Sequence, residues 1–328
     1  MWSEFLPPEE LGAGATVRLL QQFHLEPIVA LPPHAETAAM SDALAKLSRA
    51  GVSFGVWPLL SDAEGYWPSE ENAQAFEARM QAVLQFVGTQ SGLRTVAIDL
   101  EPPLGITKRL MDGSLSKRGA FLLRGVLELA LREDPRRRSV EVLTRVASTL
   151  HARSLETIAA VLPPVVLDLF AQDDLWQGVF RTPVTAPGWS VLSPMLYTTL
   201  LRRMLPSRNA ASARALLFET GKMLVSSVGP ARSSLSVGLV TTGKLGDEPA
   251  FTSPRELTLD VAAARAAGID DLALFSLEGV LRRGAPESWL VPFASASPVS
   301  PPALLSGPLG AAMRSFALAL GAGRSLLR

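Results

Sequence analysis

Residues 95–103 read Thr-Val-Ala-Ile-Asp-Leu-Glu-Pro-Pro, a short β-rich run that ends in two acids and two prolines. Such a run is typical of a strand, and the prolines mark its end. Seven similar runs occur along the chain, separated by longer stretches rich in Ala, Leu and Arg with helical spacing. The eight expected strands are residues 27–31, 52–57, 95–99, 140–146, 165–169, 191–197, 235–240 and 271–276.

Five segments with helical periodicity lie between these runs: residues 38–49, 70–87, 117–132, 210–228 and 254–267. The last has Ser253 as a candidate N-cap, Pro254 at the first helical position and Gly268 after its end. Strands that alternate with helices predict an α/β protein, a single-domain (β/α)₈ TIM barrel. A doubly wound open sheet with a small second domain is the alternative.

The chain divides by composition into three parts. Residues 1–293 are expected to form the barrel, and residues 294–302, Ala-Ser-Ala-Ser-Pro-Val-Ser-Pro-Pro, a Pro/Ser linker. Residues 303–328 are expected to form an apolar, weakly basic C-terminal helix that packs across the base of the barrel. The same helix could make a weak contact with an anionic membrane surface.

The composition excludes several classes of protein. Thirty-one basic side chains balance 31 acidic ones, so we expect no nucleic-acid partner. The absence of cysteine excludes disulfides and thiolate metal sites, and three unpaired histidines argue against a histidine metal centre. No nucleotide-binding motif occurs, so no cofactor is expected. The acidic, proline-rich start and the lack of an uninterrupted apolar run of about 18 residues predict a soluble, cytoplasmic protein. The oligomeric state stays open.

Two acids stand at the end of the third expected strand. Strand alternation sends Asp99 and Glu101 to the same side, at the barrel edge where the active sites of this fold lie. Two like charges at such a short distance resist joint ionisation. One of the two carboxyls is therefore expected to have a raised pKa, as a general acid requires. The alternative is that Asp99 caps a loop and Glu101 pairs with Lys108 or Arg109.

Aromatic residues gather at the same predicted edge. Tyr197 and Trp57 stand at or near strand ends, and loops after strands carry Tyr66, Trp67 and Trp176. Flat aromatic faces beside carboxylates suit a sugar ring, whose C–H faces stack on apolar surface while its hydroxyls bind acids. These residues therefore predict an oligosaccharide or small-molecule ligand.

Further acids could complete a carboxylate pair. Glu278 follows the last expected strand, and Asp247 and Glu248 lie in the loop after the seventh. Glycosidases need two carboxyl groups about 5 to 9.5 Å apart. Glu278 is therefore a second catalytic candidate and Asp247 a substrate-binding one, although Glu278 could instead pair with Arg282 or Arg283.

The segment that ends in Asp99-Leu100-Glu101 resembles the end of the Asp-x-x-Asp-x-Asp-x-Glu signature of chitinase-type glycoside hydrolases. Met195-Leu196-Tyr197 resembles the Met-x-Tyr strand of that family. The resemblance implies that Glu101 is the general acid and that Asp99 orients the acetamido group of the substrate. It further implies that the acetamido carbonyl attacks the anomeric carbon and that Tyr197 helps to hold it.

The chain departs from the family pattern at several positions. Ala97 and Arg94 stand where the signature has Asp, Thr198 where an Asp usually follows, and Phe275 near the place of a Trp. The acid pair also lies on the third expected strand, whereas the family has it on the fourth.

Two rival functions stay open beside glycoside hydrolysis. A non-catalytic carbohydrate-binding barrel would keep the aromatic residues and tolerate Ala97 and Thr198. A barrel enzyme acting on a small acid or phosphate could hold Mg²⁺ through Asp99, Glu101 and Glu278.

Overall fold

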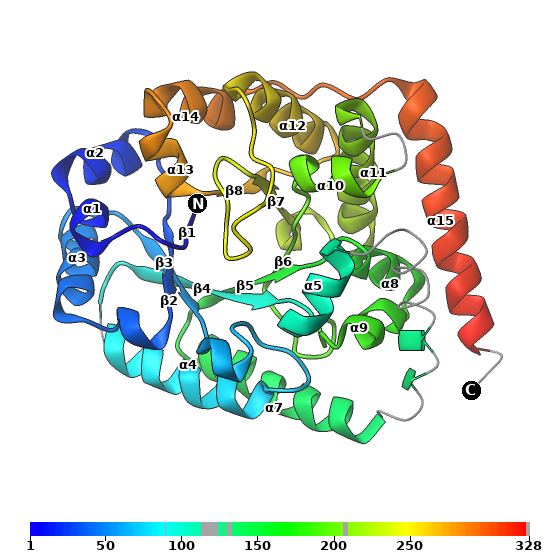
Figure 1. Cartoon of the computed structure of the whole chain (residues 1–328), viewed down its shortest axis with the longest axis horizontal. Helices are drawn as coiled ribbons and strands as arrows, with labels where there is room; N and C mark the ends of the chain where they lie inside the picture. Colours follow the sequence, from blue (N-terminus) through cyan, green and yellow to red (C-terminus); the bar gives the residue numbers. More distant parts are fainter. Residues whose placement is uncertain (89, 113–123, 127, 130–132, 206–208, 326–328) are drawn as a thin grey trace.

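The computed structural model describes residues 1–88, 90–112, 124–126, 128–129, 133–205 and 209–325, and it is a (β/α)₈ barrel (Figure 1). Eight parallel strands follow the order β6-β5-β4-β3-β2-β1-β8-β7, so β1 lies between β2 and β8. Isolated bridges between β6 and β7 close the ring. The expected fold is confirmed. The strands are β1 (Trp2–Ser3), β2 (Ile28–Leu31), β3 (Phe54–Pro58), β4 (Leu93–Leu100), β5 (Glu156–Val161), β6 (Val191–Pro194), β7 (Ser234–Gly238) and β8 (Asp271–Phe275).

Helices follow the strands and surround the sheet (Figure 1). In the described residues the α-helices are α1 (Pro8–Leu11), α2 (Gly14–Gln22), α3 (Ala38–Arg49), α4 (Ala73–Val87), α5 (Leu104–Asp112), α7 (Glu133–Ala152), α8 (Val165–Ala171), α9 (Leu175–Phe180), α10 (Thr198–Met204), α11 (Ala210–Val228), α12 (Pro254–Ala266), α13 (Leu277–Arg282), α14 (Pro286–Ser295) and α15 (Ala303–Ser325). Short 3₁₀ turns occur at η1 (Pro33–Ala35), η2 (Asp62–Glu64) and η4 (Pro230–Arg232).

Four of the five expected helices are present close to their predicted limits, as α3, α4, α11 and α12. In α12 the side chain of Ser253 makes no capping hydrogen bond. The Glu256 carboxylate instead accepts from the backbone N–H of Thr252 and thereby supports the start of the helix. The helix expected at 117–132 lies largely outside the described residues.

Two expected strands are wrong. Residues 140–146 belong to α7 and residues 165–169 to α8. In α7 the buried residues Val142, Leu143 and Val146 recur with helical spacing, so the packing of one helix face outweighs the β-propensity of valine.

Two strands were missed by the sequence patterns. β1 has only two residues, too few to show alternation, and β5 presents Ala159 and Ala160, which are poor strand formers. Because β1 precedes the others, the strand that carries Asp99 is the fourth and not the third.

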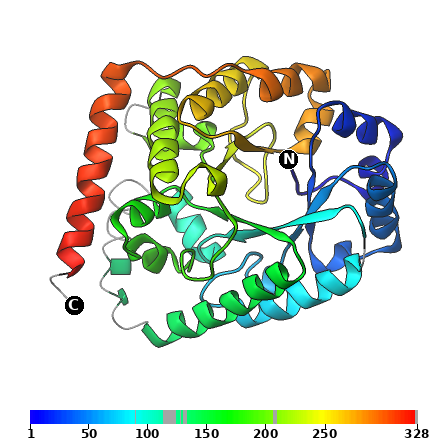
Figure 2. The ribbon, with the colours of Figure 1, turned by 180° about the vertical axis from the view of Figure 1, so that it is seen from behind.

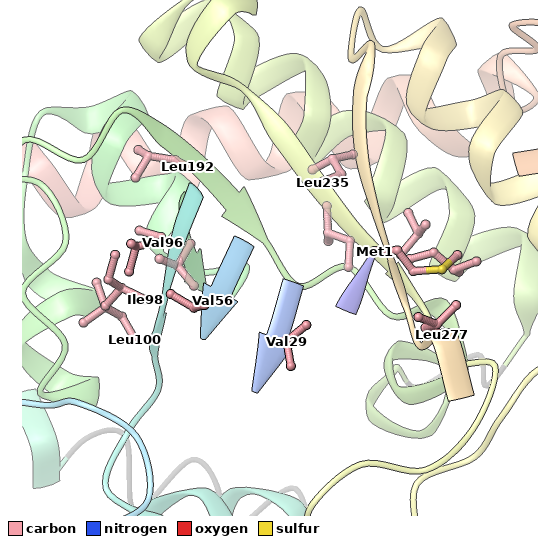
Figure 3. Packing of buried hydrophobic residues seen from close by; sticks show 14 of the residues in the cluster. Met1, Val29, Val56, Val96, Ile98, Leu100, Leu192, Leu235 and Leu277 are labelled. Atoms are coloured by element: carbon pink, nitrogen blue, oxygen red, sulfur yellow. The ribbon is translucent and has the colours of Figure 1, made fainter. Parts of the chain in front are cut away.

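Side chains of each strand divide between two layers. Val96, Ile98 and Leu100 of β4 lie in the core between the sheet and the helices (Figure 3). The inner face instead carries small residues, among them Ala97 of β4 and Ala160 of β5. Small inner residues leave space inside the ring, where a second cluster with several tryptophans packs.

Helix α15 lies along the outer flank of α8 and α11, as Figure 2 shows from behind, and so the expected packing across the barrel base is wrong. Its packed face is formed by small or polar residues, Ser306, Gly310 and Ala317, whereas Leu304 and Leu318 are exposed. Within the described residues α15 is also the one helix whose length and composition would allow it to cross a membrane, and 17% of its segment Ala303–Leu320 is buried.

Candidate active site

A cavity of about 640 Å³ opens where the carboxyl ends of the strands meet. Strand-end residues from around the ring line it, including Glu4 after β1, Trp57 of β3, Asp99 and Glu101 at β4, and Tyr197 after β6. This is the edge at which barrel enzymes place their active sites. Three of the four expected catalytic residues thus share one cavity.

Asp99 and Glu101 form the acidic centre of this cavity. Asp99 lies on the inner face of β4 and is only 4% exposed, and Glu101 follows the strand directly. Burial raises the pKa of Asp99 to about 7. Burial, together with the neighbouring Asp99 charge, holds the pKa of Glu101 well above its ordinary value. The pair therefore retains a proton near neutral pH, as a general acid must.

The loop that carries Glu101 is anchored by hydrogen bonds to a single carbonyl. The indole N–H of Trp67 donates to the Pro102 carbonyl oxygen at 2.8 Å, and the Thr107 hydroxyl donates to the same oxygen at 3.0 Å. No ion pair joins Glu101 to a described side chain, and Arg109 is exposed. The side chain of Lys108 is outside the described part.

Four of the five expected aromatic residues line the cavity: Trp57, Trp67, Trp176 and Tyr197. Trp2 joins them and stands edge-on to Trp57, with 5.1 Å between the ring centroids. The indole N–H of Trp57 has no hydrogen-bond partner among the described residues. A buried donor without a partner at a cavity wall is a ready contact for a ligand hydroxyl.

Two further acids line the cavity: Glu4, which the sequence patterns did not single out, and Glu248, which they offered only as one of the acids that could complete a carboxylate pair. Burial raises the pKa of Glu4 to about 8, although a 2.6 Å hydrogen bond donated by the Tyr66 hydroxyl partly opposes the rise. Tyr66 therefore lies behind Glu4 and does not line the cavity. The signal for Glu4 was its place one residue past a strand, the same position that Glu101 holds, but β1 was too short to be recognised.

Two expected acids lie away from the cavity wall. The Glu278 carboxylate accepts from the backbone N–H groups of Glu4 and Phe5, at 3.2 and 3.3 Å, so it supports the segment after β1. Arg282 pairs with Glu10 instead of Glu278. In the loop after β7, Asp247 points into solvent while Glu248 faces the cavity and accepts from the Gly243 N–H at 2.7 Å.

The acids of this cavity are not arranged as a metal site. Among the described residues no three Asp, Glu or His side chains are grouped so that they could hold a metal ion. Glu278, which the Mg²⁺ hypothesis requires beside Asp99 and Glu101, bonds to backbone amides instead. The donor set therefore does not fit that hypothesis.

Comparisons with known proteins give matches in structure alone. No protein-family model matches the chain, and no curated protein matches it. The PgaB (BpsB) glycoside hydrolase domain from Bordetella bronchiseptica is similar, with a TM-score of 0.52 and 9% identity over 91% of this chain and 99% of that domain. An exo-β-1,4-mannosidase from an Opitutaceae bacterium has a TM-score of 0.50 and 12% identity over 97% of this chain.

This chain spans 60% of the mannosidase. A family 2 AP endonuclease from Brucella melitensis has a TM-score of 0.46 and 14% identity over 89% of this chain and 97% of its own. At 9 and 12% identity, the likeness to the glycoside hydrolase domain and the mannosidase shows the fold. The chain is a (β/α)₈ barrel with an acidic, aromatic-lined cavity, and glycoside hydrolase barrels are among the solved structures similar to it.

Proposed function

We propose that the protein is a glycoside hydrolase that acts on an N-acetylated saccharide, with Glu101 as general acid and Asp99 as its partner. The observation that carries the proposal is the placement of Asp99 and Glu101 at the end of β4 inside a cavity walled by aromatic rings, where burial raises the pKa of both carboxyls. The structures of a glycoside hydrolase domain and a mannosidase, which share the fold, support the same class.

Protonated Glu101 would donate its proton to the glycosidic oxygen as the bond to the anomeric carbon breaks. Asp99 stands on the same face of β4, where its charge orients the acetamido group that the chitinase-type resemblance implies as nucleophile. Burial keeps the pKa of Tyr197 well above its ordinary value, so its hydroxyl stays protonated and can donate to the acetamido oxygen. Trp57 and Trp67 supply faces for the sugar ring.

A non-catalytic carbohydrate-binding barrel is the second candidate. It is favoured by Ala97, which stands in a place where the family signature has Asp. Such a protein would retain the aromatic wall and bind sugar without hydrolysing it.

Hydrolysis of β-N-acetylglucosaminides with two kinds of leaving group tests the proposal. With a poor leaving group such as a second sugar, Glu101→Gln should lower turnover by about 10²- to 10⁴-fold, because the amide cannot donate a proton readily. With an activated dinitrophenyl leaving group, which departs without protonation, the loss should be much smaller.

Glu141→Gln on α7 is a matched control, since Glu141 is exposed and outside the cavity. An equal loss with both leaving groups would remove Glu101 from the role of general acid. A wild-type protein that binds the saccharides but hydrolyses none would identify the binding barrel instead.

A further inference from the structure

The two halves of the cavity differ in chemistry. Around β1, β4 and β7 the wall carries Glu4, Asp99, Glu101 and Glu248. The other half is formed by side chains of α8, α9, α10, α11 and α15 and carries no charge. Its residues include Leu167, Trp176, Phe180, Met204, Leu216 and Met313. One cavity therefore has an acidic end and an apolar end.

The apolar half is held in place by buried polar contacts behind it. The Asp168 carboxylate of α8 accepts from the backbone N–H groups of Trp176 and Gln177, at 3.1 and 2.9 Å, and so fixes the start of α9. Trp176 then stacks on Phe180 with 5.6 Å between the ring centroids. Hydrogen bonds and ring stacking behind the wall thus fix the positions of its side chains.

Helix α15 completes the apolar half from outside the barrel. Met313 lines the cavity, and the neighbouring Arg314 pairs with Glu219 of α11 at 3.4 Å. A Cβ at Gly310 would lie 2.1 Å from a Glu219 carboxylate oxygen, so this glycine makes room for the ion pair. The ring of Phe316 approaches that of Trp176, with centroids 6.5 Å apart.

We infer that the preferred substrate is a saccharide with an apolar aglycone, such as an alkyl or acyl chain of a glycolipid. The inference rests on the proposed function and specifies the chemical class of the leaving group. Of the side chains of α8, α9, α10, α11 and α15 that line the cavity, only Trp176 and Thr220 carry a polar group, so most hydroxyls of a second sugar there would be buried without a hydrogen bond. An alkyl chain there would bury methylenes, and each buried methylene should strengthen binding about two- to fourfold.

Calorimetric titration with a series of alkyl glycosides tests the inference. The probes are methyl, butyl, hexyl and octyl β-N-acetylglucosaminides, each below its micelle concentration, together with octanol as the chain without sugar. Affinity should rise by about two- to fourfold for each added methylene. Octanol alone should bind much more weakly than the octyl glycoside, because it has no sugar to contact the acidic end of the cavity.

Met313→Gln should remove most of the chain-length dependence while leaving the affinity for the methyl glycoside unchanged. Leu318→Gln is the matched control, since Leu318 is on the same helix but is 58% exposed and outside the cavity. Methyl-glycoside binding with no dependence on chain length would overturn the inference and leave the saccharide site standing. Octanol that binds as tightly as its glycoside would overturn both the inference and the saccharide site.

Discussion

At the residue scale, the Asp99–Glu101 pair is stable in the fold because it avoids carrying two charges. Two ionised carboxylates in a buried site would repel each other and lose their hydration, so the lower-energy state retains a proton. Burial raises the pKa of both carboxyls, and the Asp99 charge raises that of Glu101 further. Near neutral pH, where free carboxyls are ionised, the pair can therefore still donate a proton.

Asp99→Asn removes the second-largest contribution to the raised pKa of Glu101, after burial. The general acid works only while protonated, so its pKa sets the basic limb of the pH–rate profile. That limb should move to lower pH, whatever the change in maximal rate. Glu248→Gln should shift it in the same direction by less, because that charge ranks below Asp99. A basic limb that stays in place in Asp99→Asn would contradict the assignment.

Glu4 makes the stability of the fold depend on pH. Its pKa is about 8 in the folded protein and 4.5 ordinarily, so between these values the folded state binds more protons than the unfolded state. The free energy of unfolding should therefore fall as pH rises from 4.5 to 8, by up to about 1.4 kcal/mol per pH unit. Urea unfolding should show a flatter pH dependence for Glu4→Gln. Glu10→Gln, at an exposed acid nearby, should retain the wild-type slope.

At the element scale, Arg79 of α4 ties together the ends of two strands. Its Nε donates to the Leu59 carbonyl at 2.9 Å and its Nη2 to the Leu31 carbonyl at 2.7 Å, and its Nη1 pairs with Glu36. The side chain is 8% exposed. The bond to Leu59 satisfies a carbonyl just past the end of β3, whereas the Leu31 carbonyl at the end of β2 also accepts from the Leu59 backbone N–H at 3.2 Å.

Arg79→Met should lower the free energy of unfolding by about 2 to 4 kcal/mol, since the Leu59 carbonyl and Glu36 would lose their partner and the Leu31 carbonyl would lose one of its two donors. Urea denaturation measures the change. Arg145→Met is the control, because the Arg145–Glu77 pair lies on the surface with Arg145 57% exposed, and it should cost less than about 1 kcal/mol. Equal losses of unfolding free energy in the two variants would show that the hydrogen bonds of Arg79 do not stabilise the fold more than a surface ion pair does.

At the scale of the whole molecule, two seams of the barrel have few strand pairs. β1 and β8 pair only at Trp2 and Phe275, and the other such seam lies between β6 and β7. β4 and β5 pair over six successive residues, whereas β6 and β7 meet only at the bridges Leu192 to Ser233 and Met195 to Ser236. Buried hydroxyls reinforce the seam, where Ser193 bonds Ser236 at 2.9 Å. The seam is also where Tyr197 enters the cavity.

Amide hydrogen exchange should therefore be faster in β6 and β7 than in β4 and β5, because fewer ladder bonds need to open. Mass spectrometry of peptides from the four strands measures the difference. Ser193→Ala should widen it by removing a hydroxyl bridge. Uniform protection around the ring would contradict a weak seam.

Other whole-molecule expectations stay predictions. These are the division at residues 294–302, the cytoplasmic location, the absence of a nucleic-acid partner, and a weak membrane contact through α15. The exposed Leu304 and Leu318 place apolar side chains where such a contact would form. Co-sedimentation with anionic lipid vesicles would measure it.

Local sequence patterns were enough to predict the class of fold and to place Asp99 and Glu101 on one face of a strand. The alternation of strands and helices can be recognised from local periodicity. Two residues separated by one position in a strand share a face, so Asp99 and Glu101 could be placed together. The same local rules misread residues 140–146, because their β-branched residues pack as one face of a helix.

Which other groups lie beside the Asp99–Glu101 pair depends on contacts between distant segments. Glu4 reaches the cavity because β1, far away in sequence, takes its place between β2 and β8. The loop conformation after β7 turned Glu248 inward and Asp247 outward, and the packing of α15 on α8 and α11 brought Met313 to the apolar end. These placements depend on contacts between segments distant in the chain, and local sequence patterns carry no information about such contacts.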